Sequence, residues 1–218
     1  MTTSPSTFRL LLWPSLITLA ISLLRLLGEV QGWVNAQSGG AGHLLGISWC
    51  IFVFGGWFAT RLARAGSLPR HLPAWPWGIA LLLLQLGAFV WAVKDIDPVM
   101  PATAEAQLAA ADALGISIVQ LVICTSVLAA FAFTIWPRLC WTLLLYGLGA
   151  RLTVVALTWW AKSAGWNTHY TKFGPQGFER DLPRTLASAS LAQLGMWVPL
   201  TVVFGCVVGT LFARRRAA

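Results

Sequence analysis

Six apolar runs dominate the chain, and most of its polar residues gather between them. The runs cover about residues 8–28, 44–63, 74–93, 113–136, 139–161 and 187–212. Each has about 20 residues or more, enough to cross a hydrocarbon core of roughly 30 Å at about 1.5 Å per helical residue. None alternates apolar and polar residues as a lipid-facing barrel strand does, so each must be helical to satisfy its own backbone hydrogen bonds in lipid. The pattern predicts an all-α, polytopic membrane protein built as a bundle of six transmembrane helices.

Composition agrees with a chain that lies almost entirely in the bilayer. Hydrophobic residues make up 57% of the 218 residues and charged residues only 10%, with a mean hydropathy of +0.72. Six spans leave only short links, so we expect a single membrane domain over residues 1–218, with the lipid bilayer as its main surrounding. The four cysteines fall in or beside apolar runs and are interpreted as small buried hydrophobic residues: Cys50, Cys124, Cys140 and Cys206.

Charge is distributed unevenly among the links. The links after the second and fourth runs and the C-terminal tail are basic, through Arg61, Arg64, Arg70, Arg138 and Arg214–Arg216. By the positive-inside rule these segments belong in the cytoplasm. The sequence therefore predicts a multi-pass protein of the plasma (inner) membrane, with both termini cytoplasmic and the links at 29–43, 94–112 and 162–186 outside. Because this topology explains most of the net charge of +8, no nucleic-acid partner is expected.

Arg151 is the residue that fits least with a lipid environment. It lies about 18 Å into the fifth run, near the middle of the bilayer, where a guanidinium costs about 2.5–3.5 kcal/mol on insertion scales. It must therefore face the interior of the bundle. Two interpretations of the acidic residues stay open: Glu29 forms a local ion pair with Arg25, four residues away on the same helical face, or Glu29, with or without Asp112, supplies the counter-charge to Arg151.

Other polar side chains are predicted to lie at depth in five different spans: Ser48, Gln85, Gln120, Thr153 and Gln193. Taken singly, each would form a hydrogen bond with a neighbouring helix. Taken together with Arg151, they indicate a polar chamber that is open to the outside. Most of the 13 tryptophans lie near the predicted ends of the spans, as interfacial anchors do. Three lie deeper and could line such a cavity or pack between helices: Trp49, Trp57 and Trp197.

The last outer link, residues 162–186, is the longest polar segment. Its Gly174-Pro175-Gln176-Gly177 stretch is typical of a turn, which favours a link folded back over the bundle. We expect it to form a lid whose His169, Tyr170, Lys172 and Arg184 complete a site begun by Arg151. The acidic neighbours Glu179 and Asp181 are equally typical of a solvated loop.

Several kinds of chemistry have no sequence support. The three histidines lack metal-ligand spacing, and neither a phosphate-binding loop nor a nucleophile elbow occurs. We therefore predict no metal site and no cofactor, and we identify no catalytic residue.

Three functions remain open. The first is binding or transport of a small anionic or amphiphilic molecule through an outward-facing polar chamber with Arg25, Glu29, Asp112, Gln120, Arg151, Gln193 and the lid residues as its ligand contacts. The second is an accessory subunit that packs against partner membrane subunits or forms a homo-oligomer. The third is a membrane enzyme acting on a lipid headgroup, with His169 as general base and Glu179 or Asp181 orienting it.

Overall fold

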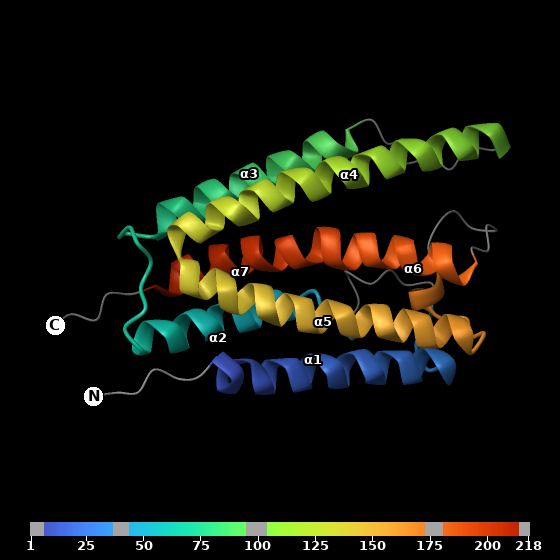
Figure 1. Cartoon of the computed structure of the whole chain (residues 1–218), viewed down its shortest axis with the longest axis horizontal. Helices are drawn as coiled ribbons and strands as arrows, with labels where there is room; N and C mark the ends of the chain where they lie inside the picture. Colours follow the sequence, from blue (N-terminus) through green and yellow to red (C-terminus); the bar gives the residue numbers. More distant parts are fainter. Residues whose placement is uncertain (1–6, 37–43, 95–103, 173–180, 214–218) are drawn as a thin grey trace.

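The chain folds into a bundle of long helices (Figure 1). The computed structural model describes residues 7–36, 44–94, 104–172 and 181–213, and within these it does not describe the side chains of residues 104–114. The helices are α1 (Thr7–Val30), α2 (Cys50–Arg64), α3 (Trp75–Val93), α4 (Ala104–Ile135), α5 (Pro137–Ser163), the short 3-10 helix η1 (His169–Thr171), α6 (Leu182–Ser190), the π-helix η2 (Leu191–Trp197) and α7 (Val198–Phe212). The described part of the chain is all-α, as predicted.

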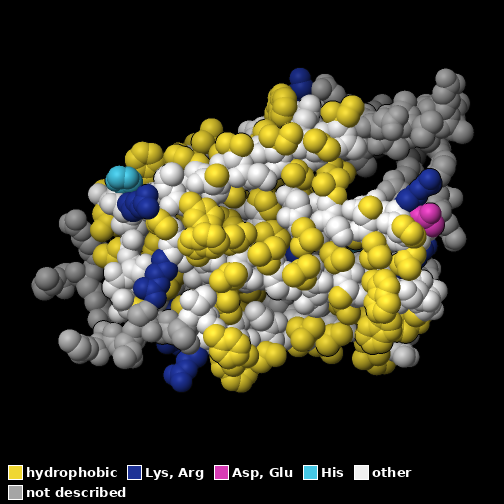
Figure 2. All heavy atoms as spheres, viewed as in Figure 1, with side chains coloured by type: hydrophobic (Ala, Val, Ile, Leu, Met, Phe, Trp, Pro, Cys, Tyr) yellow, Lys and Arg dark blue, Asp and Glu magenta, His cyan; other side chains and the backbone are white. Residues whose placement is uncertain are grey.

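Five helical segments are long and apolar enough to cross a membrane: Thr7–Val30, Trp75–Val93, Gly115–Ile135, Pro137–Ser163 and Leu182–Phe212, the last running through α6, η2 and α7. Apolar side chains cover much of the visible outer face of the bundle (Figure 2). Such a face is suited to lipid, because water would not solvate it. The chain is thus a multi-pass membrane protein with five candidate spans.

The sixth predicted span, at 44–63, is not confirmed. Helix α2 begins only at Cys50 and has 15 residues, about 22 Å of helix. Residues 44–49 form turns instead, and the Trp49 indole donates a hydrogen bond of 2.9 Å to the carbonyl of Leu44. Hydropathy alone overestimated this helix, because an apolar segment can also be buried as a turn when it lines an internal cavity.

The two ends of the bundle differ in charge. Helix α1 begins, α2 ends, α5 begins and α7 ends at one end (Figure 1), where basic side chains gather (Figure 2), including Arg61, Arg64, Arg70 and Arg138. We call this the basic end, and the opposite end, where α1 and α5 finish, the η1 end. No aspartate or glutamate occurs in residues 30–94, 113–178 or 182–218, so the links at the basic end carry no acidic residue.

Helix α7 lies between the α3–α4 pair and the layer formed by α1, α2 and α5 (Figure 1). Its glycines allow close approach: a Cβ atom on Gly55 of α2 would lie 2.8 Å from the Cα atom of Gly205 in α7. The structure uses Gly55 and Gly205 for packing inside the bundle.

Candidate functional site

Arg151 lies in the interior of the bundle, with only 4% of its surface exposed. Its Nη1 donates a hydrogen bond of 3.2 Å to Oε1 of Gln193. Its Cζ lies 4.5 Å from the centroid of the Trp197 ring, a cation–π distance. Both contacts were beyond sequence reasoning, which named Gln193 and Trp197 but not their pairing with Arg151.

The π-helix η2 brings these two partners to Arg151. Gln193 and Trp197 both lie on η2, while Pro199 follows in the first turn of α7. Proline has no amide hydrogen and would clash with the carbonyl four residues earlier, so Pro199 disfavours an α-helical turn at this point. A π-turn in a long helix is often found at a functional site. The signal that could have revealed it is a proline in the middle of the 187–212 run.

No carboxylate among the described side chains lies within 4.0 Å of Arg151. The ion pairs among the described residues join Glu29 to Arg25 and to His169. The interpretation of Glu29 as the counter-charge of Arg151 is therefore wrong, and the local Arg25–Glu29 ion pair is the correct one. Asp112 lies in α4, and its side chain is outside the described residues. A guanidinium has five N–H donors, and Gln193 accepts one of those of Arg151.

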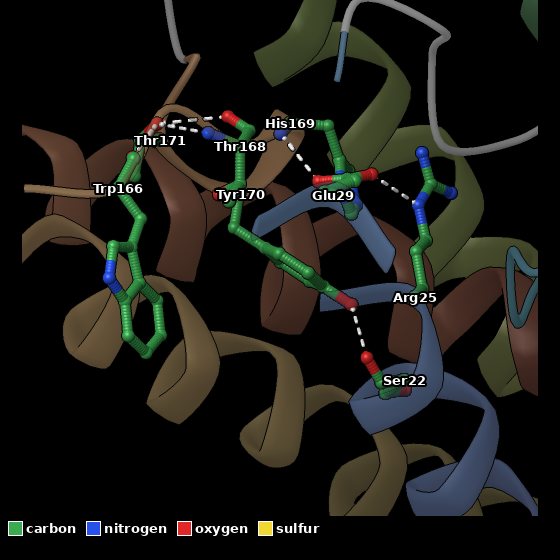
Figure 3. Close-up of polar contacts among 8 residues, drawn as sticks. All are labelled: Ser22, Arg25, Glu29, Trp166, Thr168, His169, Tyr170 and Thr171. Atoms are coloured by element: carbon green, nitrogen blue, oxygen red, sulfur yellow. Dashed lines mark hydrogen bonds and ion pairs between the residues drawn. The ribbon is translucent and has the colours of Figure 1, made fainter. Parts of the chain in front are cut away.

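Glu29 joins α1 to η1 (Figure 3). Its Oε1 accepts a hydrogen bond of 2.9 Å from Nε of Arg25. Its Oε2 lies 2.9 Å from the backbone nitrogen of His169 and 2.8 Å from Nδ1 of the same residue. The Glu29 side chain is fully buried, so this carboxylate satisfies both partners away from solvent. The spacing of α1 predicted the Arg25 contact, whereas the His169 contact joins residues 140 positions apart.

Tyr170 forms a second contact between η1 and α1. Its ring points from η1 towards α1 (Figure 3), and its hydroxyl donates a hydrogen bond of 3.2 Å to the carbonyl of Ser22. Only 4% of the residue is exposed, and this burial raises the pKa of the phenol, because the charged form would lose its hydration. Together, Glu29 and Tyr170 hold η1 against the end of α1.

Beneath η1 lies a cavity of about 330 Å³. It is lined by charged and polar side chains from α1, α5, η1 and η2, and by the turn that precedes α2: Ser22, Arg25, Leu45, Gly46, Ile47, Ser48, Arg151, Val154, His169, Tyr170, Lys172, Ala192, Gln193 and Trp197. We call it the Arg151 cavity. The turn at 45–48 explains the shortened α2, because non-helical backbone at membrane depth is tolerated where it borders a cavity.

Several residues named from the sequence lie elsewhere. Gln85 is buried and donates a hydrogen bond of 3.2 Å to Thr125 of α4, and Thr153 donates to the carbonyl of Gly149. Neither they nor Gln120, in α4, line the Arg151 cavity. Polar residues within a span can serve helix packing, and composition alone does not separate that role from a chamber.

The predicted lid residues also divide into two groups. Lys172 lines the Arg151 cavity together with His169 and Tyr170. Arg184 does not: it is exposed in the first turn of α6, and its backbone nitrogen donates a hydrogen bond of 3.0 Å to Oδ1 of Asp181, the N-cap of that helix. Glu179 falls outside the described residues.

The cavity has an excess of positive charge among the described side chains. Arg25, Arg151 and Lys172 line it, and Glu29, which touches Arg25 and His169, is the nearby carboxylate. A buried guanidinium with donors directed at a cavity suits a carboxylate or a phosphate, which accept two parallel N–H hydrogen bonds. Cavities of about 300–1,000 Å³ accommodate small molecules.

No family model, curated protein or solved structure matches this chain.

Proposed function

We propose that the protein binds or transports a small anionic or amphiphilic molecule, whose carboxylate or phosphate group contacts Arg151 in the Arg151 cavity. The observation that carries this proposal is a guanidinium with 4% exposure that faces a cavity of about 330 Å³ with no described carboxylate within 4.0 Å. A buried cation without a counter-ion is costly in lipid. An anionic guest reduces that cost, and this gives the guest a specific affinity for the site.

Two further features support the proposal. Lys172 adds a further cation at the cavity, while Leu45, Ile47 and Val154 provide an apolar wall. An amphiphile with one anionic group and a short apolar part matches both surfaces. Because Glu29 is already satisfied by Arg25 and His169, it does not need to leave Arg151 when the guest enters.

The orientation belongs to the same proposal. The basic end lies in the cytoplasm with both termini, and the η1 end faces the outside of the plasma (inner) membrane, because arginines collect at the basic end and the positive-inside rule places such links in the cytoplasm. Cysteine substitution tests it: a membrane-impermeant maleimide should label Lys172→Cys on intact cells and Arg70→Cys only after permeabilisation. The reverse labelling pattern would show that the η1 end, and not the basic end, faces the cytoplasm.

Thermal unfolding of the purified protein tests the function. Butyrate, butyl phosphate and inorganic phosphate are the probes, and butanol is the uncharged control. A probe at one hundred times its Kd stabilises the protein by about 2.7 kcal/mol, which for a chain of this length raises Tm by roughly 5–11 °C. Arg151→Gln should remove that shift and leave the fold intact, because a neutral side chain is less costly to bury.

Arg184→Gln is the matched control, because it removes an exposed arginine from the same end of the bundle. It should respond to the anions as the wild type does. An anion-dependent shift that survives in Arg151→Gln would refute the proposal, and so would a shift of equal size with butanol.

A second candidate function has one specific observation in its favour. Nδ1 of His169 contacts the buried carboxylate of Glu29, and a carboxylate in this position orients an imidazole for general-base catalysis. A membrane enzyme acting on a lipid headgroup would use this pair in place of the predicted Glu179 or Asp181. Mass spectrometry of phosphatidylglycerol vesicles incubated with the protein tests it: headgroup loss that is absent in His169→Gln would support an enzyme, and unaltered lipid would exclude this reaction.

A further inference from the structure

A second hollow lies on the outer surface near the basic end and shares no residue with the Arg151 cavity. It has a volume of about 370 Å³ and is formed by α2 and the last residue of α7: Phe52, Val53, Gly56, Trp57, Thr60, Arg61, Arg64 and Phe212. We call it the α2 groove. It follows α2 from its apolar middle to its last turn, which carries the two arginines.

The apolar part of the α2 groove is shaped by Gly56. This residue is buried, and a Cβ atom built on it would lie 3.2 Å from Cε2 of Phe212, so the glycine lets the Phe212 ring lie close to α2 and form an apolar floor. Phe52 and Val53 remain 48% and 54% exposed beside it. A groove with an apolar floor and exposed apolar walls fits a single hydrocarbon chain.

The other part of the α2 groove is cationic. Arg61 and Arg64 are exposed and lie three residues apart on the last turn of α2, on neighbouring positions of the helix surface. The guanidinium of Arg61 lies 5.4 Å from the centroid of the Trp57 ring, a contact that limits its freedom. No described carboxylate lies within 4.0 Å of either arginine, and residues 30–94 contain no acidic residue at all.

This combination goes beyond what helix anchoring requires. Arginines at a helix C-terminus balance the helix dipole and prefer the interface wherever they lie, but neither effect calls for an open apolar groove alongside them. A membrane phospholipid matches both parts of the α2 groove: its phosphate lies at the interface, where the arginines are, and its acyl chains extend from there towards the midplane, along the apolar part. Basic pockets beside membrane helices bind anionic headgroups.

We infer that the α2 groove is a binding site for an anionic membrane phospholipid, with its phosphate between Arg61 and Arg64 and one acyl chain over Gly56. The headgroup carries net negative charge, because two arginines without a nearby carboxylate favour an anion over a zwitterion. The site is independent of the Arg151 cavity, so either can fail in experiment without the other.

Native mass spectrometry of the full chain tests this inference. The protein is exchanged into vesicles of phosphatidylglycerol and phosphatidylcholine in equal amounts, extracted in mild detergent, and analysed for retained lipid. The wild type should retain phosphatidylglycerol, and Arg61→Gln/Arg64→Gln should reduce that retention about tenfold. Arg70→Gln, an exposed arginine at the same end outside the α2 groove, should retain lipid as the wild type does.

A second pair of variants tests the acyl chain. Gly56→Leu should fill the floor of the α2 groove and reduce retention while both arginines remain. Val53→Trp fills it from an exposed position, which keeps the test valid if Gly56→Leu fails to fold. Equal retention of the two lipids, equal loss in Arg70→Gln, unchanged retention in Val53→Trp, or full competition by inorganic phosphate would each overturn the inference.

Discussion

Glu29 is predicted to stabilise the η1 end by holding η1 against the end of α1. The informative change is Glu29→Gln, which keeps the size of the side chain and removes its charge. In the wild type the carboxylate is fully buried and faces three donor groups, from Nε of Arg25 and from the backbone and Nδ1 of His169. Glutamine offers one acceptor oxygen and turns its own NH2 group towards the remaining donors.

The magnitude follows from these contacts. A hydrogen bond to a charged group contributes about 1.5–3 kcal/mol, and removing one partner of a buried ion pair costs about 3–5 kcal/mol. Arg25 is only 2% exposed, so water cannot fully replace the lost carboxylate. We expect Glu29→Gln to lower the free energy of unfolding by about 3–5 kcal/mol, equivalent to a fall in Tm of roughly 6–20 °C for a chain of this length.

Thermal unfolding in detergent measures this loss, and hydrogen exchange at residues 166–172 shows where it occurs. The backbone amide of His169 donates to Glu29, so its protection should fall with the stability. Asp181→Asn is the matched control, because it also replaces a carboxylate by an amide, but at the exposed N-cap of α6. Asparagine caps a helix about as well as aspartate does. A Tm for Glu29→Gln within about 2 °C of that of the control, with the His169 amide still protected, would refute this reasoning.

Two further predictions concern packing and titration. Gly55→Ala should destabilise the bundle by about 1–3 kcal/mol, because its Cβ would lie 2.8 Å from the backbone of Gly205. Gly149→Ala meets nothing within 4 Å and should not lower the stability in the same thermal assay, because alanine favours a helix more than glycine does. Equal losses in the two variants would contradict the close contact. Burial raises the pKa of Tyr170, so the unfolded chain loses the phenolic proton first and stability should fall as pH rises above about 10. Tyr170→Phe should flatten that decline, and an unchanged pH profile of unfolding would argue against a buried phenol.

Part of the candidate site was accessible to sequence reasoning. The Arg25–Glu29 pair follows from a spacing of four residues on one helix, and the burial of Arg151 follows from the cost of a cation in lipid. Whether Glu29 pairs with Arg25 or with Arg151 stayed open at the level of sequence, because the sequence does not show how α1 is rotated towards α5. His169 lies 140 residues from Glu29, and no local pattern indicates that contact.

The helix boundaries show the same division. Hydropathy located the apolar segments but not the end of regular structure within them: residues 44–49 are turns, and η2 replaces α-helix around Gln193. Residues 44–49 form turns because they border a cavity, which accepts non-helical backbone that lipid would reject. Pro199 disfavours α-helix near Gln193, but a proline in an apolar run does not by itself show where a π-helix forms.

The sequence by itself determined the membrane environment, the helical class, the asymmetry of charge and the presence of one cation that lipid does not tolerate. These are properties of single segments, fixed by hydropathy, helical rise and side-chain charge. Only the tertiary structure decided which side chains from different helices meet. A shift of one residue turns a side chain by about 100° around its helix axis, so contacts between helices depend on rotation and depth. These two quantities place Gln193 and Trp197 beside Arg151, and they place His169 of η1, and not Arg151, beside Glu29.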